Sequence, residues 1–242
     1  MIEIAPMSDV TRQWLEFCSK YIFGFDEFQY SRVCMASLDA ARCLNKHKEK
    51  VATPGKRFKK GEVLLALTNL TKSMTNDRAK IIDQIVEFVS GRKIETALDS
   101  GCGFCAIPLF LQNRGDIKGP ITGIDILDDM IFSAKELTKK CNGNANILFE
   151  VAGDPDFSEC HKDQFDLVTC LDGIIDLDFV EPTLAQIATV CKPGGLVIFT
   201  HPINGNGNDY YIDHLYEYGD FRYLRGYETD EIRYTYALEK VR

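Results

Sequence analysis

The sequence predicts an α/β fold, in which a doubly wound, mostly parallel sheet follows an N-terminal helical cap and ends in an antiparallel strand. Up to residue 92, apolar residues recur at helical spacing. From residue 93 onward, short apolar strand patterns alternate with helix-length stretches, which is typical of βαβ units and a parallel sheet. We therefore expect a helical cap over residues 1–92 and a sheet domain over residues 93–242.

Four segments of the cap are predicted to be helices. In front of the first of them, Ser8 and Asp9 form an N-capping signal. Gly91 follows the last one, and a glycine commonly ends a helix. The predicted helices are Ser8–Tyr21, Gln29–Lys48, Glu62–Leu70 and Asn76–Ser90.

A basic stretch, Lys46–Lys60, interrupts these helices in a protein that is acidic as a whole. Runs of this kind are usually solvated loops. The alternative is that the stretch steers an anionic substrate, such as a carboxylate, a phosphate or a carrier-bound acyl group.

Five short apolar runs predict the strands of the sheet: Thr96–Asp99, Ile121–Ile126, Ile147–Val151, Phe165–Cys170 and Leu196–Thr200. Between most of them lie three helical patterns, Phe104–Gln112, Asp129–Lys140 and Val180–Val190. The end of the chain is different. There we expect a helix at Asp209–Tyr218 and a last strand at Ile232–Glu239, with Phe221–Arg225 as its partner.

Composition excludes several classes of function. The 242 residues carry a net charge of −8, which argues against a nucleic-acid or membrane-surface partner. No apolar run approaches the roughly 18 residues of a membrane span, and Met1–Val10 does not resemble a signal peptide. The nine cysteines are scattered, which favours reduced thiols and a cytoplasmic location. The sequence leaves the oligomeric state open.

The stretch ALDSGCGFCA, residues 97–106, holds an acid and two glycines where the first strand ends. In a doubly wound sheet, ligands bind at the carboxyl ends of the strands. Gly101 and Gly103 allow the backbone to turn sharply and to approach a ligand closely. Asp99 would repel a pyrophosphate and attract a cation, so we expect a cationic ligand here.

Cys102 and Cys105 have the C-x-x-C spacing of redox and zinc sites. A second pair of this kind is absent from the sequence, so we expect no metal and instead two small residues packed at the loop.

Further acids follow the next strands. Asp125 suits a ribose diol, because one carboxylate can accept hydrogen bonds from two hydroxyls; the alternative is a capping or turn acid. Asp154 suits an exocyclic amine, or it is a turn residue in front of Pro155. Asp172 places one more acid on the same rim.

From about Ile94 to Thr200, these motifs together resemble the class I S-adenosylmethionine-dependent methyltransferases, a family with a Rossmann-like fold. ALDSGCG resembles the family's first motif, and GIDILDDMI resembles its second-strand motif. AGDPDF, FDLVTCLDGI and the turn CKPGG match the later motifs in the same order. The resemblance implies S-adenosyl-L-methionine as cofactor and a small-molecule acceptor.

The resemblance also implies which residues bind the cofactor. Gly101, Cys102 and Gly103 would lie along its methionine part, with Asp99 nearby. Asp125 and Ile126 would hold the ribose, with Met130 at the methionine position that follows in the motif. Gly153, Asp154 and Pro155 would face adenine, and Cys170 and Leu171 would line the end of the methionine moiety. One departure is Cys105, where the family usually has a small residue, often glycine.

The expected reaction is an in-line attack by a nitrogen, oxygen or carbon nucleophile on the sulfonium methyl. The loop after Leu171 lacks the Asn/Asp-Pro-Pro-aromatic motif of enzymes that methylate nucleobase or glutamine amino groups. His201 is the candidate base, or it caps its strand. Asp172 is a candidate for contact with an acceptor amine, or it lies near the cofactor's ammonium. Tyr21 is a candidate for contact with the acceptor, although the aromatic residues around it are equally suited to packing the cap.

Two other functions stay open. In some proteins with this fold the cofactor's own amino group attacks its side chain, and methylthioadenosine is released. A protein of this fold can also lose its activity and serve as a binding subunit, but the intact acids at Asp99 and Asp125 argue against that.

Overall fold

The computed structural model describes residues 8–22, 78–103, 105–126, 131–132, 134–135, 138–139, 146–152, 155–171, 180–202, 209–230 and 233–242. The chain forms two compact units. One comprises Met1–Lys46 and Lys59–Ser90, and the other comprises His47–Phe58 and Gly91–Arg242. The predicted helices Gln29–Lys48 and Glu62–Leu70, and the basic stretch Lys46–Lys60, lie outside the described residues.

The first unit contains α1 (Asp9–Phe17), a π-helical turn η1 (Cys18–Ile22) and α4 (Arg78–Val89). Ser8 caps α1 as predicted, since its hydroxyl accepts a hydrogen bond from the Thr11 N–H and donates one to Asp83 at 2.6 Å. Trp14 is fully buried. The bond from Ser8 to Asp83 therefore anchors the start of α1 to α4, and both helices lie where the sequence predicted two of the four.

The second unit contains a seven-stranded sheet with the order β3-β2-β1-β4-β5-β7-β6. Neighbouring strands are parallel from β3 to β5, whereas β7 runs antiparallel to both β5 and β6. This confirms the predicted doubly wound sheet and its antiparallel last strand. The strands are β1 (Ala97–Ser100), β2 (Ile121–Asp125), β3 (Ile147–Val151), β4 (Phe165–Leu171), β5 (Cys191–Pro202), β6 (Phe221–Asp230) and β7 (Arg233–Lys240).

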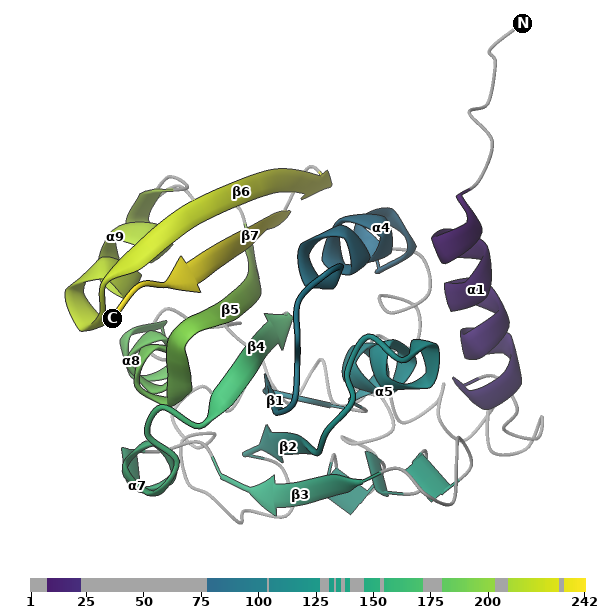
Figure 1. Cartoon of the computed structure of the whole chain (residues 1–242), viewed down its shortest axis with the longest axis horizontal. Coiled ribbons are helices and arrows are strands. Elements are labelled where there is room, and N and C mark those ends of the chain that lie inside the picture. Colours follow the sequence, from purple (N-terminus) through teal and green to yellow (C-terminus); the bar gives the residue numbers. More distant parts are fainter. Residues whose placement is uncertain are drawn as a thin grey trace, which may run out of the picture. The chain divides into compact units, whose positions relative to one another are not determined.

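Helices cover both faces of this sheet. Figure 1 shows α7 (Pro155–Cys160), α8 (Val180–Val190) and α9 (Asp209–Tyr218) on one face and α5 (Ala106–Arg114) on the other. The described residues within the predicted helix Asp129–Lys140 are also helical. No helix in the described part of the chain is long and apolar enough to cross a membrane.

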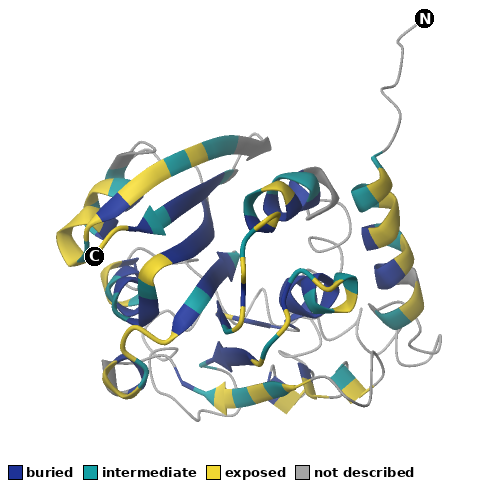
Figure 2. Cartoon of the chain, in the orientation of Figure 1, coloured by how far each residue is buried: buried dark blue, intermediate teal, exposed yellow. Residues whose placement is uncertain are grey.

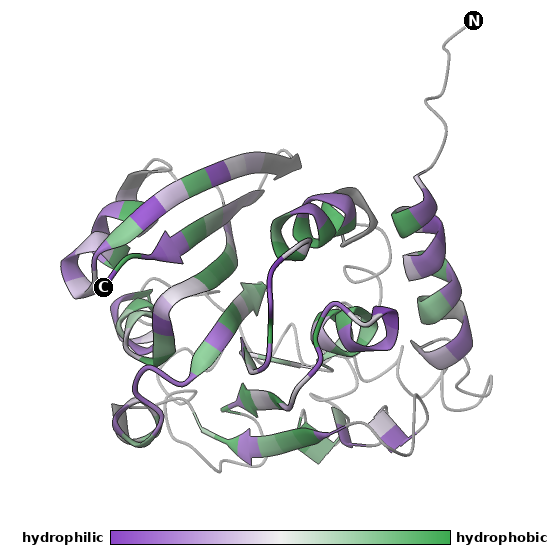
Figure 3. Ribbon diagram, viewed as in Figure 1, coloured by the Kyte–Doolittle hydropathy of each residue, from purple (hydrophilic) through white to green (hydrophobic). Residues whose placement is uncertain are grey.

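Burial follows the strand order. Every residue of β1 and β2 is buried, whereas the edge strand β3 alternates between half-buried and exposed residues (Figure 2). Hydrophilic and hydrophobic residues are interspersed along the opposite edge strand, β6 (Figure 3). A single apolar cluster joins α8 and α9 to β4, β5 and β7, so the core supports the strands whose ends carry the predicted site.

Two strands differ from their predicted bounds by more than one residue. β5 begins at Cys191, which pairs with Phe165, and the predicted turn Lys192–Gly195 bulges out before the ladder resumes at Leu196. Gly194 has a φ of +78° there, which explains the need for glycine in the bulge. β6 continues to Asp230, beyond the predicted Arg225, with two register shifts along β7.

Asp166 joins three segments at the amino ends of the strands. Its carboxylate accepts hydrogen bonds from the backbone N–H groups of Glu95 and Thr96, each at 2.9 Å, and from Lys192 at 2.9 Å. Burial alone would raise the pKa of Asp166, but these hydrogen bonds outweigh it and hold the pKa below the ordinary value of 3.8.

The lowered pKa of Asp166 predicts a loss of stability in acid. A carboxyl whose pKa is lower in the folded state stabilises the fold above its unfolded pKa, and this contribution disappears as the pH falls through the folded pKa. We expect the free energy of unfolding in urea to decline below about pH 4. In Asp166→Asn the decline should be shallower. Parallel curves for the two proteins would show that Asp166 does not contribute.

Candidate active site

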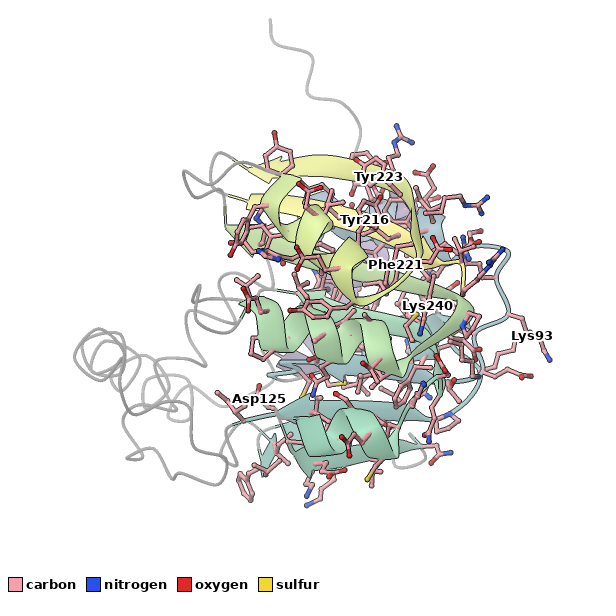
Figure 4. The ribbon with its side chains drawn as sticks, turned by 90° about the vertical axis from the view of Figure 1, so that its left-hand side faces the viewer. Lys93, Asp125, Tyr216, Phe221, Tyr223 and Lys240 are labelled. Carbon is pink, nitrogen blue, oxygen red and sulfur yellow. The ribbon has the colours of Figure 1, made fainter. Side chains whose placement is uncertain are left out.

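The strand order reverses between β1 and β4. From β1 the chain adds β2 and β3 on one side of that strand, and it then crosses over to add β4 and β5 on the other side. Such a switch point is where a doubly wound sheet binds its ligand. The carboxyl ends of β1, β2 and β4 carry Asp99, Asp125 and Leu171. Figure 4 shows Asp125 at this end of the sheet and Lys93, which precedes β1, at the other.

The loop after β1 has an unusual backbone. Gly101 and Gly103 have φ values of +66° and +49°, and Cys105 has a φ of +56°. Two backbone hydrogen bonds hold this loop: the Cys102 N–H donates to the Ile124 carbonyl at 2.8 Å, and the Cys105 N–H donates to the Cys102 carbonyl at 2.6 Å. Left-handed backbone suits glycine best, so these φ values agree with the predicted sharp turn, while the close approach to a ligand stays a prediction.

Asp125 is attached to this loop. Its carboxylate oxygen Oδ2 accepts a hydrogen bond from the Gly103 N–H at 3.0 Å, and the residue is 8% exposed. The end of β2 and the glycine loop are thereby fixed to each other. Asp125 is thus more than a turn acid, because its side chain organises the loop of the neighbouring strand.

Asp99 is the third of the four residues of β1 and is 6% exposed. The Thr169 hydroxyl on β4 donates a hydrogen bond to Asp99 Oδ1 at 2.6 Å. Thr169 and Asp99 are direct partners in the β1–β4 register, so the sheet itself sets this contact. The Cys105 thiol is also buried near Asp99, whose carboxylate contributes to raising the pKa of that thiol.

Both loop cysteines are buried, as the sequence predicted. Burial is the largest cause that raises the pKa of each thiol well above 9.0. For Cys102 the negative charges of Cys105, Asp125 and Asp99 raise the pKa further. Because the thiolate is the form that reacts and binds metals, this environment favours a packing role over a redox or zinc site.

The residues present fit S-adenosyl-L-methionine. Two carboxylates stand at neighbouring strand ends, with a left-handed glycine loop between them. Acids suit a ligand that offers an ammonium, a sulfonium and a ribose diol, whereas a phosphate would require N–H donors or cations. Asp125 and Asp99 would hold the ribose and the amino-acid end, as the resemblance implies.

The other predicted cofactor residues are partly described. Ile126 directly follows β2, and Cys170 and Leu171 end β4, with Cys170 fully buried. Pro155 is the first residue of α7, a position at which proline fits a helix well. Met130, Gly153, Asp154 and Asp172 lie outside the described residues, so their roles stay predictions.

His201 lies near the end of β5 and is 1% exposed. Its ring stacks on Tyr211 of α9 with centroids 3.8 Å apart, and Tyr236 of β7 lies 5.3 Å away. This aromatic packing favours the alternative in which His201 supports the strand end. Tyr21 belongs to the other unit, in η1, where its ring lies 5.1 Å from that of Phe17. The catalytic roles of both residues stay predictions.

Sequence reasoning missed two polar residues that contact the end of β1. One is Thr169, described above, and the other is Gln186 of α8, whose Oε1 accepts a hydrogen bond from the Ser100 hydroxyl at 3.1 Å. Gln186 is 6% exposed and lies among buried apolar residues of its helix. A polar residue on an apolar helix face is the signal that would have found it, since buried polar groups require partners.

Comparisons with known proteins agree with this geometry. A family model described as a methyltransferase domain matches residues 97–195. A ubiquinone biosynthesis O-methyltransferase of Saccharophagus degradans is 32% identical over 133 residues, which cover 55% of this chain and 52% of the relative. The aklanonic acid methyltransferase DauC of Streptomyces sp. is 32% identical over 125 residues, which cover 51% of this chain and 54% of the relative.

Among solved structures, magnesium protoporphyrin IX methyltransferase from Synechocystis PCC 6803 aligns with a TM-score of 0.57. The alignment covers 85% of this chain and 97% of that one at 14% identity, so it concerns the fold. The chain spans about half the length of the curated relatives that it matches.

These matches support the resemblance of the motifs to the class I S-adenosylmethionine-dependent methyltransferases. The comparisons thereby support the Rossmann-like fold and S-adenosyl-L-methionine as the cofactor.

Proposed function

We propose that this protein transfers the methyl group of S-adenosyl-L-methionine to an oxygen nucleophile of a small molecule. The observation that carries the proposal is the pair of buried carboxylates, Asp99 and Asp125, around a left-handed glycine loop to which Asp125 is bonded. Two relatives support the oxygen acceptor and the small-molecule class, since one is named an O-methyltransferase of ubiquinone biosynthesis and the other an aklanonic acid methyltransferase.

In this proposal the chain acts mainly by positioning. When bound, S-adenosyl-L-methionine supplies a methyl group on a positively charged sulfur, which a nucleophile can attack directly. Asp125 accepts from the ribose hydroxyls, and Asp99 attracts the cationic amino-acid end. Holding two reactants in line can contribute roughly 7–11 kcal/mol to catalysis, so no covalent intermediate with the protein is needed.

The residues that bind the acceptor are predictions from the sequence. Residues 1–92 are the predicted substrate-binding region, with Tyr21 as one contact, and Asp172 is the predicted acid on the sheet rim. An anionic or carrier-bound acceptor would agree with the basic stretch Lys46–Lys60. A cytoplasmic location likewise rests on the scattered cysteines.

If His201 is the base that removes the acceptor proton, His201→Phe should lower kcat by about 10²–10⁴-fold without changing cofactor affinity. Phenylalanine suits the position, because the ring of His201 is buried in an aromatic stack with Tyr211 and Tyr236. Turnover should be measured with saturating cofactor, and affinity by titration calorimetry. Normal turnover in this variant would assign His201 to packing alone.

The first experiment is mass spectrometry of small molecules after incubation of the pure protein with S-adenosyl-L-methionine alone. Retention of intact cofactor by the protein agrees with a methyltransferase that awaits its acceptor. Accumulation of methylthioadenosine would instead show that the cofactor is itself the substrate, and the proposal would fail. A protein that binds no cofactor would be a binding subunit.

A screen of phenolic, enolic and carboxylic small molecules should then follow. The expected product carries one added methyl group, and S-adenosylhomocysteine forms in equal amount. Methylation of amines only would overturn the oxygen acceptor but leave the methyltransferase activity in place.

A further inference from the structure

Two buried side chains from different elements interact with the carboxylate of Asp99. Thr169 reaches it from β4, with its hydroxyl 2.6 Å from Asp99 Oδ1. Cys105, at the start of α5, is near enough for the carboxylate to contribute to the raised pKa of its thiol. Both side chains are 0% exposed and uncharged, so they constrain the carboxylate without neutralising its negative charge.

The backbone at Cys105 adds a second argument. This residue is the N-cap of α5 and has a φ of +56°, a conformation that is strained for any residue except glycine. Its side chain makes no capping hydrogen bond to the helix. The contact with Asp99 is therefore what the thiol contributes at a position where glycine would fit the backbone better.

Thr169 is buried in the middle of an apolar strand, between Val168 and Cys170. Valine has the same shape and an equal preference for strands, so packing alone does not explain a hydroxyl there. The hydroxyl has two acceptors within reach, Asp99 Oδ1 and, at 3.3 Å, the Leu98 carbonyl. Both lie on β1, beside the glycine loop.

We propose that Thr169 and Cys105 are positioning residues that hold the Asp99 carboxylate toward the amino-acid end of the cofactor. This inference rests on the proposed function, because it takes the ligand of the crevice to be S-adenosyl-L-methionine. It predicts that replacing either residue weakens binding of a ligand that carries the methionine part and leaves binding of the adenosine part unchanged.

The test compares two probes by titration calorimetry with the full chain. S-adenosylhomocysteine carries the amino-acid end, whereas methylthioadenosine lacks it. Thr169→Val should weaken binding of S-adenosylhomocysteine about tenfold, because the carboxylate loses a charge-assisted hydrogen bond. Binding of methylthioadenosine should stay within twofold. Thr169→Ser keeps the hydroxyl and should restore the affinity for S-adenosylhomocysteine.

Thr122→Val is the matched control. Thr122 is a buried threonine of β2 and pairs with Leu98 on the other side of β1. The same change of hydroxyl to methyl there should alter binding of neither probe. Equal weakening of both probes by Thr169→Val, or no change in either, would overturn the inference.

Cys105→Gly keeps the inference testable if Thr169→Val does not fold. Glycine relieves the strained backbone and removes the thiol, so the unliganded protein should still unfold cooperatively while its affinity for S-adenosylhomocysteine falls selectively. Unchanged affinity would remove Cys105 from the positioning role. A wild-type protein that binds neither probe would instead overturn the proposed function itself, and with it this inference.

Discussion

Replacing Asp125 by alanine is expected to weaken binding of S-adenosyl-L-methionine by about a hundredfold. A hydrogen bond to a charged group contributes about 1.5–3 kcal/mol, and 1.4 kcal/mol corresponds to a factor of ten in affinity. In the proposed site, the variant would lose the bonds to the ribose hydroxyls. It also releases the Gly103 N–H that Asp125 Oδ2 holds at 3.0 Å, so the loop itself becomes less ordered.

Two further variants separate these causes. Asp125→Asn keeps an oxygen that can accept from the Gly103 N–H but lacks the charge, so its affinity should lie between those of the wild type and the alanine variant. Glu150→Ala removes a negative charge from the neighbouring strand β3, at an exposed position that pairs with Ile124. It should leave affinity unchanged, because the effect of Asp125 depends on contact rather than on net charge.

Titration calorimetry measures these affinities directly. A thermal melt with and without the cofactor gives an independent measure, since a ligand that binds only the folded state raises the melting temperature. Cofactor should stabilise the wild type and have little effect on Asp125→Ala. An alanine variant with wild-type affinity would remove Asp125 from the ribose role and leave it as a loop anchor.

The sequence predicted the ends of the strands because local patterns specify them. An apolar run that meets an acid and glycines marks the ends of β1 and β2, and both acids lie where these patterns indicated. Asp99 and Asp125 therefore required no knowledge of tertiary contacts. The same holds for the N-cap at Ser8, whose bond to the Thr11 N–H is local.

The contacts that orient the site could not be predicted in this way. Thr169 lies 70 residues from Asp99, and Gln186 lies 86 residues from Ser100, so only the sheet register and the packing of α8 bring them together. The short helix α7 was missed because six residues give little periodicity. The strand β6 was predicted too short, because Gly226 and the charged residues after it resemble a turn, whereas pairing with β7 extends it to Asp230.

Lys240 leads to the second large prediction, which concerns stability. This lysine at the end of β7 is 7% exposed. Its ammonium donates to the Ala188 and Cys191 carbonyls, each at 2.8 Å, and to Asp163 at 2.7 Å. The two carbonyls belong to the end of α8 and the start of β5. Lys240 thus satisfies backbone groups that the end of a helix otherwise leaves without partners.

Lys240→Met should lower the free energy of unfolding by about 2–4 kcal/mol, because methionine fills a similar volume but leaves the buried carbonyls without a donor. For a chain of this size, each kcal/mol lowers the melting temperature by roughly 2–4 °C. Asp163→Asn is the matched control. It removes only the ion pair, whose carboxylate side chain is 39% exposed, and should cost less than about 1 kcal/mol.

Cofactor affinity should distinguish this stabilising role from a role in the site. Asp125 and Lys240 lie toward opposite ends of the sheet in Figure 4, since Lys240 ends an antiparallel strand at the amino ends of its parallel neighbours. The folded fraction of Lys240→Met should therefore bind S-adenosyl-L-methionine as tightly as the wild type at a temperature well below its transition. A loss of affinity in the folded variant would mean that the end of α8 is coupled to the cofactor site. The path through Gln186 and Ser100 would then be the first to examine, because it joins α8 to the last residue of β1, next to the glycine loop.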